Sequence, residues 1–313
     1  MPTCAIVFGS SELKQIQNLE NMKPVIIVHG GCGGVPEAEQ AGRNAICQAA
    51  ADAGYQVLID GGSAVEAVEA AVMSMENSRV LNAGVGAYAQ ADGVARRDAS
   101  IMAGDGRAGS VAQVPLLKNP IRLAGYLLRQ DAHVMLVGEP AFRLGLRLKH
   151  ECTFSLTAAK QEYWLKHLSE ACINLDYEAM AAEWKASNPR LGTVGCVALD
   201  RTGALAAGTS TGGTGQVFPG RCGDTPIIGG GTYCTKQAGV SMTGTGERIM
   251  ALLSAKTLVD YVRHSRPVEE AGLLVLNELQ SVSKGSAGLV ALDAQGNAAH
   301  LTNTPFMAWA QRR

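Results

Sequence analysis

The sequence predicts a layered α+β domain in which helices lie outside a pair of sheets. Two observations lead to this prediction. Short apolar segments punctuated by glycine, which favour strands, occur in both halves of the chain together with segments of helical periodicity. Residues 150–190, between the halves, contain no glycine and many Lys, Glu and Ala residues. We therefore expect two halves of one sheet structure joined by a helical connector.

The first elements are a strand and two helices. The run PVIIVHGG, 24–31, is apolar and ends in glycines, which is typical of a buried strand. Apolar residues then recur near helical spacing from Glu37 to about Ile59. A Gly-Gly pair ends that helix, and Ser63 is a suitable N-cap for the next one. We expect both helices to pack on one side of a sheet.

Short strands and a further helix complete the first half. The segment 84–102 and the segment 109–114 predict strands, with a hairpin turn at the Ala-Asp-Gly sequence of 91–93. Asn119 to Gln130 predicts a helix. The connector follows, with helical stretches between residues 150 and 190.

The second half repeats this order. Two strands flank the Asp-Arg-Thr-Gly turn of 200–203, and a later strand leads into one long helix that starts near Thr245. Pro267 opens another helix, whose first turn carries two glutamates that suit the helix dipole. The segment 287–303 predicts a closing hairpin.

Composition excludes several classes of protein. The 313 residues carry a net charge of −1 without basic runs, so we expect neither nucleic acid nor a membrane surface as partner. No apolar run approaches the ~18 residues of a membrane span. Residues 1–22 lack the basic start of a signal peptide, so we interpret them as an extension before a domain that begins at Lys23. The expected location is the cytoplasm.

The cysteines give no sign of a metal site. The chain has 8 cysteines and 6 histidines, without a C-x-x-C pair or zinc-ligand spacing. We expect reduced thiols, and no cofactor for catalysis.

The sequence GTVGCVALD, 192–200, raises a chemical question, because a strand starts abruptly at a Gly-Thr pair. A threonine hydroxyl needs a base to act as a nucleophile. If the Gly192–Thr193 bond is cut, the new α-amine of Thr193 can serve, since its unperturbed pKa is about 7.7–8.0. Spacing alone favours an ordinary strand start over a cleavage site.

Neighbouring motifs favour the chemical interpretation. TSTGG, 209–213, follows one hairpin later and would bring Thr211 beside Thr193. Arg221 and Asp224 lie in a glycine-rich loop and suit the α-carboxylate and α-ammonium of an amino acid, although a simple surface ion pair is an alternative. TGTGE, 243–247, marks a strand-to-helix junction that could stabilise an oxyanion, or serve as an ordinary N-cap.

Together these motifs resemble one family, the plant-type L-asparaginases or isoaspartyl aminopeptidases, which are N-terminal nucleophile hydrolases. The resemblance runs from about Pro24 to Trp309. The motifs that carry it are VHGG (28–31), LNAGVGA (81–87), RDASIM (97–102), GTVGCVALD (192–200), TSTGG (209–213), PGRCGDTP (219–226) and TGTGE (243–247).

The resemblance implies a four-layer αββα sandwich of the N-terminal nucleophile (Ntn) hydrolase type in a single domain. The precursor would cut itself between Gly192 and Thr193. Residues 23–192, with the connector at about 150–190, would form the α chain of the domain, and 193–313 its β chain. The two chains would stay associated, and two αβ units would form a dimer.

The resemblance also implies roles for individual residues. Thr193 would be the nucleophile and Thr211 would hydrogen-bond near it. Arg221 and Asp224 would bind the substrate's α-carboxylate and α-ammonium. The oxyanion hole and the asparagine near the nucleophile would be supplied by Thr243, Gly244 and Asn82.

The substrates implied are L-asparagine and β-aspartyl dipeptides, hydrolysed through a β-aspartyl ester. The family also has a sodium-binding loop of backbone carbonyls, which matches Met75 to Val85. A structural Na⁺ would then be held by Met75, Glu76, Ser78, Leu81, Ala83 and Val85.

Two alternatives stay open. A glycosylasparaginase has related chemistry, but that branch is typically secretory or lysosomal. A homologue that does not cleave itself and only binds amino acids is the second. The sequence departs from the family at Cys32, at Ser286-Ala287-Gly288 and in the connector, which leaves the ranking of asparagine against β-aspartyl dipeptides undecided.

Overall fold

The computed structural model describes residues 23–154, 156–186 and 192–313, and the predicted extension 1–22 lies outside them. Within these residues the chain forms two sheets, as the sequence predicts for a mixed α and β protein. The larger sheet, in spatial order, contains β11 (Phe306–Arg312), β1 (Val25–Gly33), β5 (Val194–Leu199), β6 (Leu205–Thr211), β2 (Arg96–Ala103), β3 (Ala108–Pro115) and β4 (Met135–Val137). The smaller contains β10 (Ala298–Thr302), β9 (Ala287–Asp293), β8 (Ala238–Gly244) and β7 (Thr232–Cys234).

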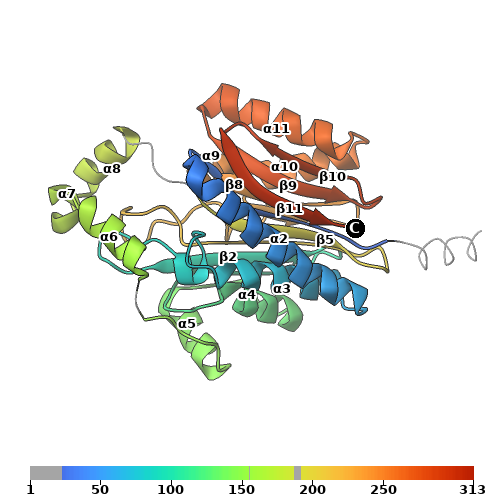
Figure 1. Cartoon of the computed structure of the whole chain (residues 1–313), viewed down its shortest axis with the longest axis horizontal. Coiled ribbons are helices and arrows are strands. Elements are labelled where there is room, and N and C mark those ends of the chain that lie inside the picture. The colour runs from blue at the N-terminus through green and yellow to red at the C-terminus, as the bar shows by residue number, and fades with distance from the viewer. Residues whose placement is uncertain (1–22, 155, 187–191) are drawn as a thin grey trace, which may run out of the picture.

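Helices α2 (Glu37–Ile59) and α3 (Ala64–Glu76) pack together on the larger sheet, as predicted (Figure 1). Ser63 caps α3 in a reciprocal capping box, in which the Ser63 N–H donates to Glu66 Oε2 at 2.8 Å. The two helices approach closely at Gly54, where a Cβ would lie 2.7 Å from the Ala67 carbonyl oxygen. Alanine and glycine at this contact therefore set the spacing between the helices.

Three apolar clusters hold the layers together. One lies between the larger sheet and α2, α3 and α4 (Pro120–Gln130). A second lies between the smaller sheet and α10 (Ser254–Arg263) and α11 (Val268–Ser283). The third joins the two sheets face to face through residues such as Ile27, Val197 and Leu292. In Figure 1, α10 and α11 lie above the sheets, and α3 and α4 lie below them.

The predicted hairpin turn at 91–93 is wrong. Residues 91–93 do form a turn, since Gly93 N–H donates to the Gln90 carbonyl at 3.0 Å. However, among the described residues no strand ends directly before this turn, so it does not connect two strands of a hairpin. The hairpin of β2 and β3 turns instead through Gly104, Asp105 and Gly106, where Gly106 has φ +98°. Both 92–93 and 105–106 are Asp-Gly pairs, which favour the same hairpin turns, so the sequence pattern alone could not show which pair connects the two strands.

The single long helix predicted from Thr245 is two helices. Thr245 is the N-cap of α9 (Gly246–Ala251). The helical conformation is then interrupted at Leu253, which has φ +47°, before α10 begins. Apolar residues continue across the break, so helical periodicity did not reveal it. The shortened α9 keeps its N-terminus beside β8.

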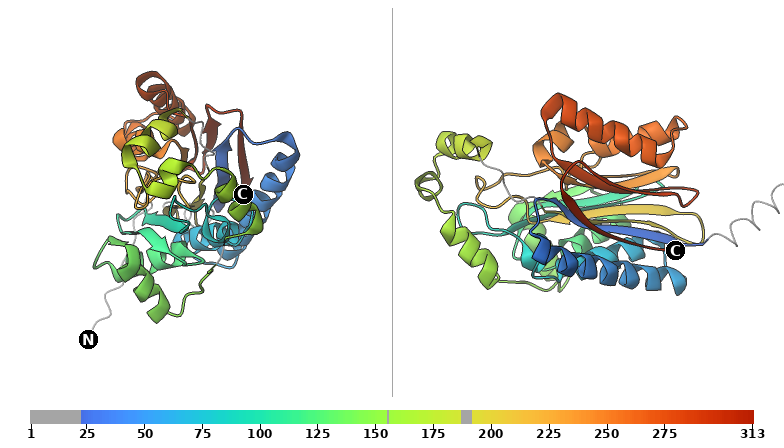
Figure 2. Two further views of the ribbon diagram at one scale, coloured as in Figure 1. Left: turned by 90° about the vertical axis from the view of Figure 1, so that its left-hand side faces the viewer. Right: turned by 45° about the horizontal axis from the view of Figure 1, so that its top comes forward.

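The connector is helical, as predicted, with α6 (Ala158–Lys166), α7 (Glu170–Asn174) and α8 (Tyr177–Ala186). These helices lie at one end of the molecule, outside the two sheets (Figures 1 and 2). The elements β4, α5 (Gly138–Arg147) and the closing strand β11 were not predicted from the sequence. In the described residues, no helix is long and apolar enough to cross a membrane.

Candidate active site

Thr193 and Thr211 lie side by side across a β-hairpin. Thr193 directly precedes β5 and Thr211 ends β6, and the antiparallel register pairs Val194 with Ser210. Thr193 is buried, with 6% of its surface exposed, and its hydroxyl donates to Thr211 Oγ1 at 3.2 Å. The adjacency expected from hairpin spacing is therefore present.

The carbonyl of Gly192 receives two side-chain hydrogen bonds. Asn82 Nδ2 donates to it at 2.9 Å and Thr211 Oγ1 donates at 3.0 Å. Asn82 is itself fixed, because its Oδ1 accepts the backbone N–H of Tyr88 at 3.0 Å. Hydrogen-bond donors on a carbonyl oxygen stabilise the negative charge that develops there during nucleophilic attack. The peptide bond before Thr193 is thus polarised in the direction that favours attack.

Close backbone approaches surround this bond. Gly31 has φ +93°, and a Cβ there would lie 3.0 Å from Gly192 Cα and 3.1 Å from Thr193 N. A Cβ on Gly192 would lie 3.0 Å from Asn82 Cβ. Only glycine at position 31 combines this conformation with this space.

His29, which belongs to the VHGG motif, lies beside Thr193 and is hydrogen-bonded to its backbone. Its Nε2 is 3.0 Å from Ser241 Oγ, and Ser241 Oγ is 2.7 Å from Thr209 Oγ1. Burial lowers the pKa of His29 to about 3, against the opposing effect of its hydrogen bond to the backbone of Thr193. The imidazole is therefore neutral at physiological pH and supports Thr193 through hydrogen bonds rather than charge.

Arg221 and Asp224 come together at the N-terminus of α9. A Cβ on Gly246 would lie 2.8 Å from Asp224 Oδ1 and 3.0 Å from Arg221 Nη2. The ion pair of Arg221 is with Glu247 Oε1, at 2.7 Å, and not with Asp224. Glu247 was missed as a site residue, although it ends the TGTGE motif.

Asp224 has an unusual environment. It is 5% exposed, and its Oδ2 has no hydrogen-bond partner among the described residues. Burial raises the pKa of its carboxyl to about 7, although Arg221 opposes this change. A buried carboxylate without a partner can accept an ammonium group from a ligand.

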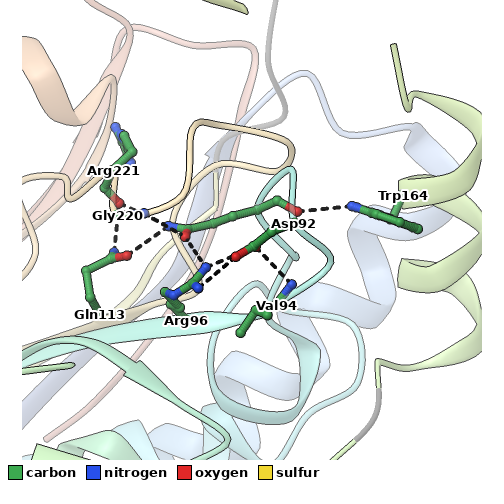
Figure 3. A network of polar contacts seen from close by, with 8 residues as sticks. Asp92, Val94, Arg96, Gln113, Trp164, Gly220 and Arg221 are labelled. Atoms are coloured by element: carbon green, nitrogen blue, oxygen red, sulfur yellow. Dashed lines mark hydrogen bonds and ion pairs between the residues drawn. The ribbon is translucent and has the colours of Figure 1, made fainter. Parts of the chain in front are cut away.

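Two glutamine side chains hold the backbone of Arg221. Gln113 Nε2 donates to the Arg221 carbonyl at 2.7 Å and Gln90 Nε2 donates at 3.2 Å, while Gly220 N–H donates to Gln90 Oε1 at 3.0 Å (Figure 3). Arg96 also donates to Gln90 Oε1, at 2.7 Å. This network could not be predicted from the sequence, because its members come from distant segments.

The same network reaches the connector and the sheet. Trp164 Nε1 donates to the Gln90 carbonyl at 3.0 Å (Figure 3). Gln113 has φ +55° at an irregularity of the β2–β3 pairing, and its N–H donates to Asp98 Oδ1 at 2.7 Å. Asp98 pairs in register with Thr211, and burial raises its pKa to about 6. The two glutamines therefore link the Arg221 loop to the strand beside Thr211.

Thr243 and Gly244 end β8. Thr243 is fully buried, and its Oγ1 has no hydrogen-bond partner in the described part of the chain. Gly244 has φ +148°, and a Cβ there would lie 2.2 Å from the Ser286 carbonyl oxygen. An unpaired buried hydroxyl is costly, and a ligand oxygen would satisfy it.

The predicted sodium loop is a tight turn rich in carbonyl oxygens. A Cβ on Gly86 would lie 2.0 Å from the Leu81 oxygen and 2.9 Å from the Ser78 oxygen, and one on Gly84 would lie 2.4 Å from the Glu76 oxygen. The carbonyls of Met75 and Ala83 accept backbone N–H groups. Val85 lies within the short 3₁₀ helix η1 (Gly84–Gly86). Backbone carbonyl oxygens are suitable ligands for a hard cation, so the chemistry of this loop fits the predicted Na⁺.

No side-chain metal site competes with this loop. Within residues 23–154, 156–186 and 192–313, no group of three or more His, Cys, Asp or Glu residues could hold a metal ion. The seven cysteines in those ranges are free. The Glu76 carboxylate instead accepts Ser210 Oγ at 2.6 Å and Ile121 N at 3.1 Å, and burial raises its pKa to about 8.

Comparison with known proteins gives one consistent result. A family model described as Asparaginase (Asparaginase_2) matches residues 22–313. The chain is 37% identical over 303 residues to the isoaspartyl peptidase of Escherichia coli strain K12, covering 92% of each chain. It is 36% identical over 299 residues to the isoaspartyl peptidase/L-asparaginase of Xenopus laevis, again covering 92% of each. It is 35% identical over 301 residues to the plant-type L-asparaginase of Thermococcus kodakarensis, covering 91% of this chain and 95% of that protein.

Proposed function

The chain belongs to the asparaginase family whose model spans residues 22–313, and on this premise we propose that it is a self-cleaving hydrolase of L-asparagine and β-aspartyl dipeptides. Its relatives are named for these two activities. The observation that carries the proposal is the Thr193 hydroxyl next to a Gly192 carbonyl that already accepts hydrogen bonds from Asn82 and Thr211.

In the first stage, the chain cuts itself. The Thr193 oxygen attacks the Gly192 carbonyl carbon, the Gly192–Thr193 C–N bond breaks, and the proton of the hydroxyl passes to the departing nitrogen. Water then hydrolyses the Gly192 ester, which leaves a carboxylate on Gly192 and a free α-amine on Thr193. This amine, with an unperturbed pKa of about 7.7–8.0, is the base that the hydroxyl lacked before cleavage.

In the second stage, the mature enzyme hydrolyses its substrate. Thr193 Oγ attacks the side-chain carbonyl of asparagine, or the β-linked carbonyl of a dipeptide, while its proton passes to the α-amine and then to the leaving nitrogen. Ammonia or the downstream amino acid departs. Water hydrolyses the β-aspartyl ester, which releases aspartate and restores the Thr193 hydroxyl.

Three groups orient the substrate. Arg221 binds the α-carboxylate and Asp224 the α-ammonium, which suits a zwitterion bound away from bulk water. Thr243 Oγ1 and the Gly244 N–H stabilise the oxyanion. Asp224 Oδ2 and Thr243 Oγ1 have no hydrogen-bond partner in the described ranges of the chain, which supports this assignment, because both would gain one from the substrate.

The other predicted features remain part of the proposal. Helices on the outer faces of two packed sheets support the four-layer αββα arrangement of Ntn hydrolases. The carbonyl loop of 75–85 would hold a structural Na⁺. We also propose a dimer of αβ units and a cytoplasmic location.

Intact mass and N-terminal sequencing of fresh and incubated protein test the proposal. We expect a fragment that begins TVGCVALD, and release of aspartate from asparagine and from β-aspartyl-leucine. The variant Thr193→Ala should remain one chain, whereas the control Thr257→Ala should cleave normally. A wild-type chain that persists uncut and releases no aspartate would favour the homologue that only binds amino acids.

A further inference from the structure

A cavity of about 230 Å³ lies next to the proposed site. Its lining includes Asn82 and Ser286, and also Arg43 of α2, Lys160 of α6 and Tyr88. None of the groups proposed to bind the aspartyl part of the substrate belongs to this lining. The cavity is thus a separate space that shares a wall with the site.

The cavity and the zwitterion-binding groups both adjoin the segment 244–246 at the end of β8. Gly244 contacts the Ser286 carbonyl, and Ser286 lines the cavity. Two residues later, Gly246 contacts Asp224 and Arg221. A substrate with its zwitterion at Arg221 and Asp224 and its reacting carbonyl at Gly244 therefore has the cavity within reach of its leaving group.

Asn82 connects the cavity to the bond-breaking position. Its side chain lines the cavity and donates to the Gly192 carbonyl, which adjoins Thr193. Tyr88 lies on the same wall and donates its N–H to Asn82 Oδ1. The wall of the cavity thus includes the side chain that holds the Gly192 carbonyl, next to the proposed nucleophile Thr193.

The cavity carries more positive than negative charge. Arg43 Nη2 pairs with Glu39 Oε2 at 3.1 Å, while Arg43 Nε is buried without a hydrogen-bond partner in the described residues. Lys160 is only 7% exposed, and its ammonium lies 3.4 Å from the centre of the Tyr88 ring. Against these two cations, the described residues of the lining include one carboxylate, Glu39. Buried cations are strong binding groups for a carboxylate ligand.

We infer that this cavity is a leaving-group subsite that binds the free α-carboxylate of the downstream amino acid of a β-aspartyl dipeptide, through Arg43 and Lys160. The inference rests on the proposed function. The volume fits one amino acid better than a longer peptide, since sites for drug-sized ligands span roughly 300–1,000 Å³. Ammonia, the leaving group of asparagine, makes no use of the subsite, so Arg43 and Lys160 determine specificity for dipeptides.

Three substrates separate this role from a structural one. L-Asparagine lacks the downstream residue, β-aspartyl-leucine has it, and β-aspartyl-leucinamide has it without the carboxylate. With cleaved Arg43→Gln, we expect the KM for β-aspartyl-leucine to rise about tenfold, as for the loss of one charge-assisted hydrogen bond. The kcat/KM for asparagine and for the leucinamide should change less than twofold. Lys160→Met should behave in the same way.

Matched controls and a charge-retaining variant accompany these measurements. Arg122→Gln, on the exposed face of α4, and Lys166→Met, on the same helix as Lys160, should leave all three substrates unchanged. Arg43→Lys should recover part of the dipeptide KM. An Arg43→Gln variant that loses asparagine and dipeptide activity equally, or neither, would overturn the inference.

A measurement on the wild type needs no variant. N-Acetyl-L-leucine, whose nitrogen is an amide as in the dipeptide and cannot pair with Asp224, should inhibit asparagine hydrolysis with an inhibition constant about tenfold lower than that of N-acetyl-L-leucinamide, because only the former carries the carboxylate. Equal inhibition constants would reject the subsite. If the wild type hydrolyses neither asparagine nor the dipeptide, the proposed function itself fails. If it hydrolyses both but shows no preference for the inhibitor that carries a carboxylate, only the subsite inference fails.

Discussion

At the scale of single residues, the proposed site contains polar atoms that ordinary protein interiors avoid. Asp224 Oδ2 and Thr243 Oγ1 are buried and have no hydrogen-bond partner among the described residues. An unsatisfied buried polar group costs about 1–3 kcal/mol. Both residues lie at the junction of β8 and α9, where Asp224 Oδ1 adjoins Gly246, so the cost is concentrated where the proposed substrate would relieve it.

The Asp224 carboxyl should make activity depend on pH. Because burial raises its pKa to about 7, the group is neutral below that pH and charged above it. The Thr193 α-amine must be unprotonated to act as base, so kcat/KM for asparagine should fall below its unperturbed pKa of about 7.7–8.0. Only the charged form of Asp224 pairs with an α-ammonium, so this carboxyl should add a second limb, a further fall of about tenfold per unit below pH 7. Asp224→Asn should have a low kcat/KM without this limb; an unchanged limb would assign it to another group.

Replacing Thr243 by valine should change activity and stability in opposite directions. Thr243→Val removes an oxyanion donor, so kcat should fall roughly 10²–10³-fold. It also removes an unpaired buried hydroxyl, so the free energy of unfolding should rise by about 1 kcal/mol. Thermal or urea unfolding in the Thr193→Ala background, where the chain stays intact, measures the second effect.

Thr232→Val is the matched control for stability. Thr232 is also fully buried, but its hydroxyl accepts from Ser100 Oγ at 2.8 Å. Loss of this contact should destabilise the protein. A Thr243→Val protein that loses stability as well would mean that the Thr243 hydroxyl has a partner after all.

At the scale of elements, the irregular end of β3 sets the position of the substrate-binding loop. Gln113 occupies a left-handed conformation, which is uncommon for residues other than glycine and is often retained at functional sites. There its side chain reaches the Arg221 carbonyl. The irregularity in β3 therefore fixes the loop that carries the guanidinium.

Gln113→Ala should weaken substrate binding rather than catalysis. Loss of one hydrogen bond to the Arg221 carbonyl should raise the KM for asparagine by about tenfold and change kcat less than twofold. Steady-state kinetics with Gln161→Ala, an exposed residue of α6, as control test this. A fall in kcat at constant KM would show that Gln113 serves Thr193 and not Arg221.

The elements also show what sequence patterns can predict. Ser63 and the glycine pair before it locate the start of α3 correctly, because a capping box is encoded within four residues. The break at Leu253 is different, since its left-handed conformation depends on packing and Leu carries no local signal for it. The contact of Gln90 and Gln113 with Arg221 joins residues 131 and 108 positions apart, and no single segment encodes it.

At the scale of the whole molecule, the two proposed chains share one sheet. In the order β11-β1-β5-β6-β2-β3-β4, β1 of the α chain lies between β11 and β5 of the β chain, and β6 lies beside β2. The pair Thr193 and Thr211 was predictable because one hairpin encodes it. The approach of Asn82, Arg221 and Asp224 to that hairpin depends on this strand order, which no local sequence pattern encodes. The family resemblance implied the layers and the residue roles, not the order of the strands.

Cleavage should therefore not separate the chains. Under native conditions we expect both fragments to co-elute in size exclusion at the position of the uncut Thr193→Ala protein. They should separate only at denaturant concentrations that also remove the circular dichroism signal of the sheets. Separation of the fragments without unfolding would contradict the interleaved order.

Interleaving has a further consequence for the life of the enzyme. An intact chain folds by a first-order process, whatever its concentration. Once the Gly192–Thr193 bond is cut, refolding from the unfolded state requires two molecules to meet, so its rate depends on their concentration and falls steeply in dilute solution. The mature enzyme would then owe its persistence to slow unfolding rather than to a favourable refolding equilibrium. The covalent connection needed for efficient assembly would be lost in the step that creates the catalytic base.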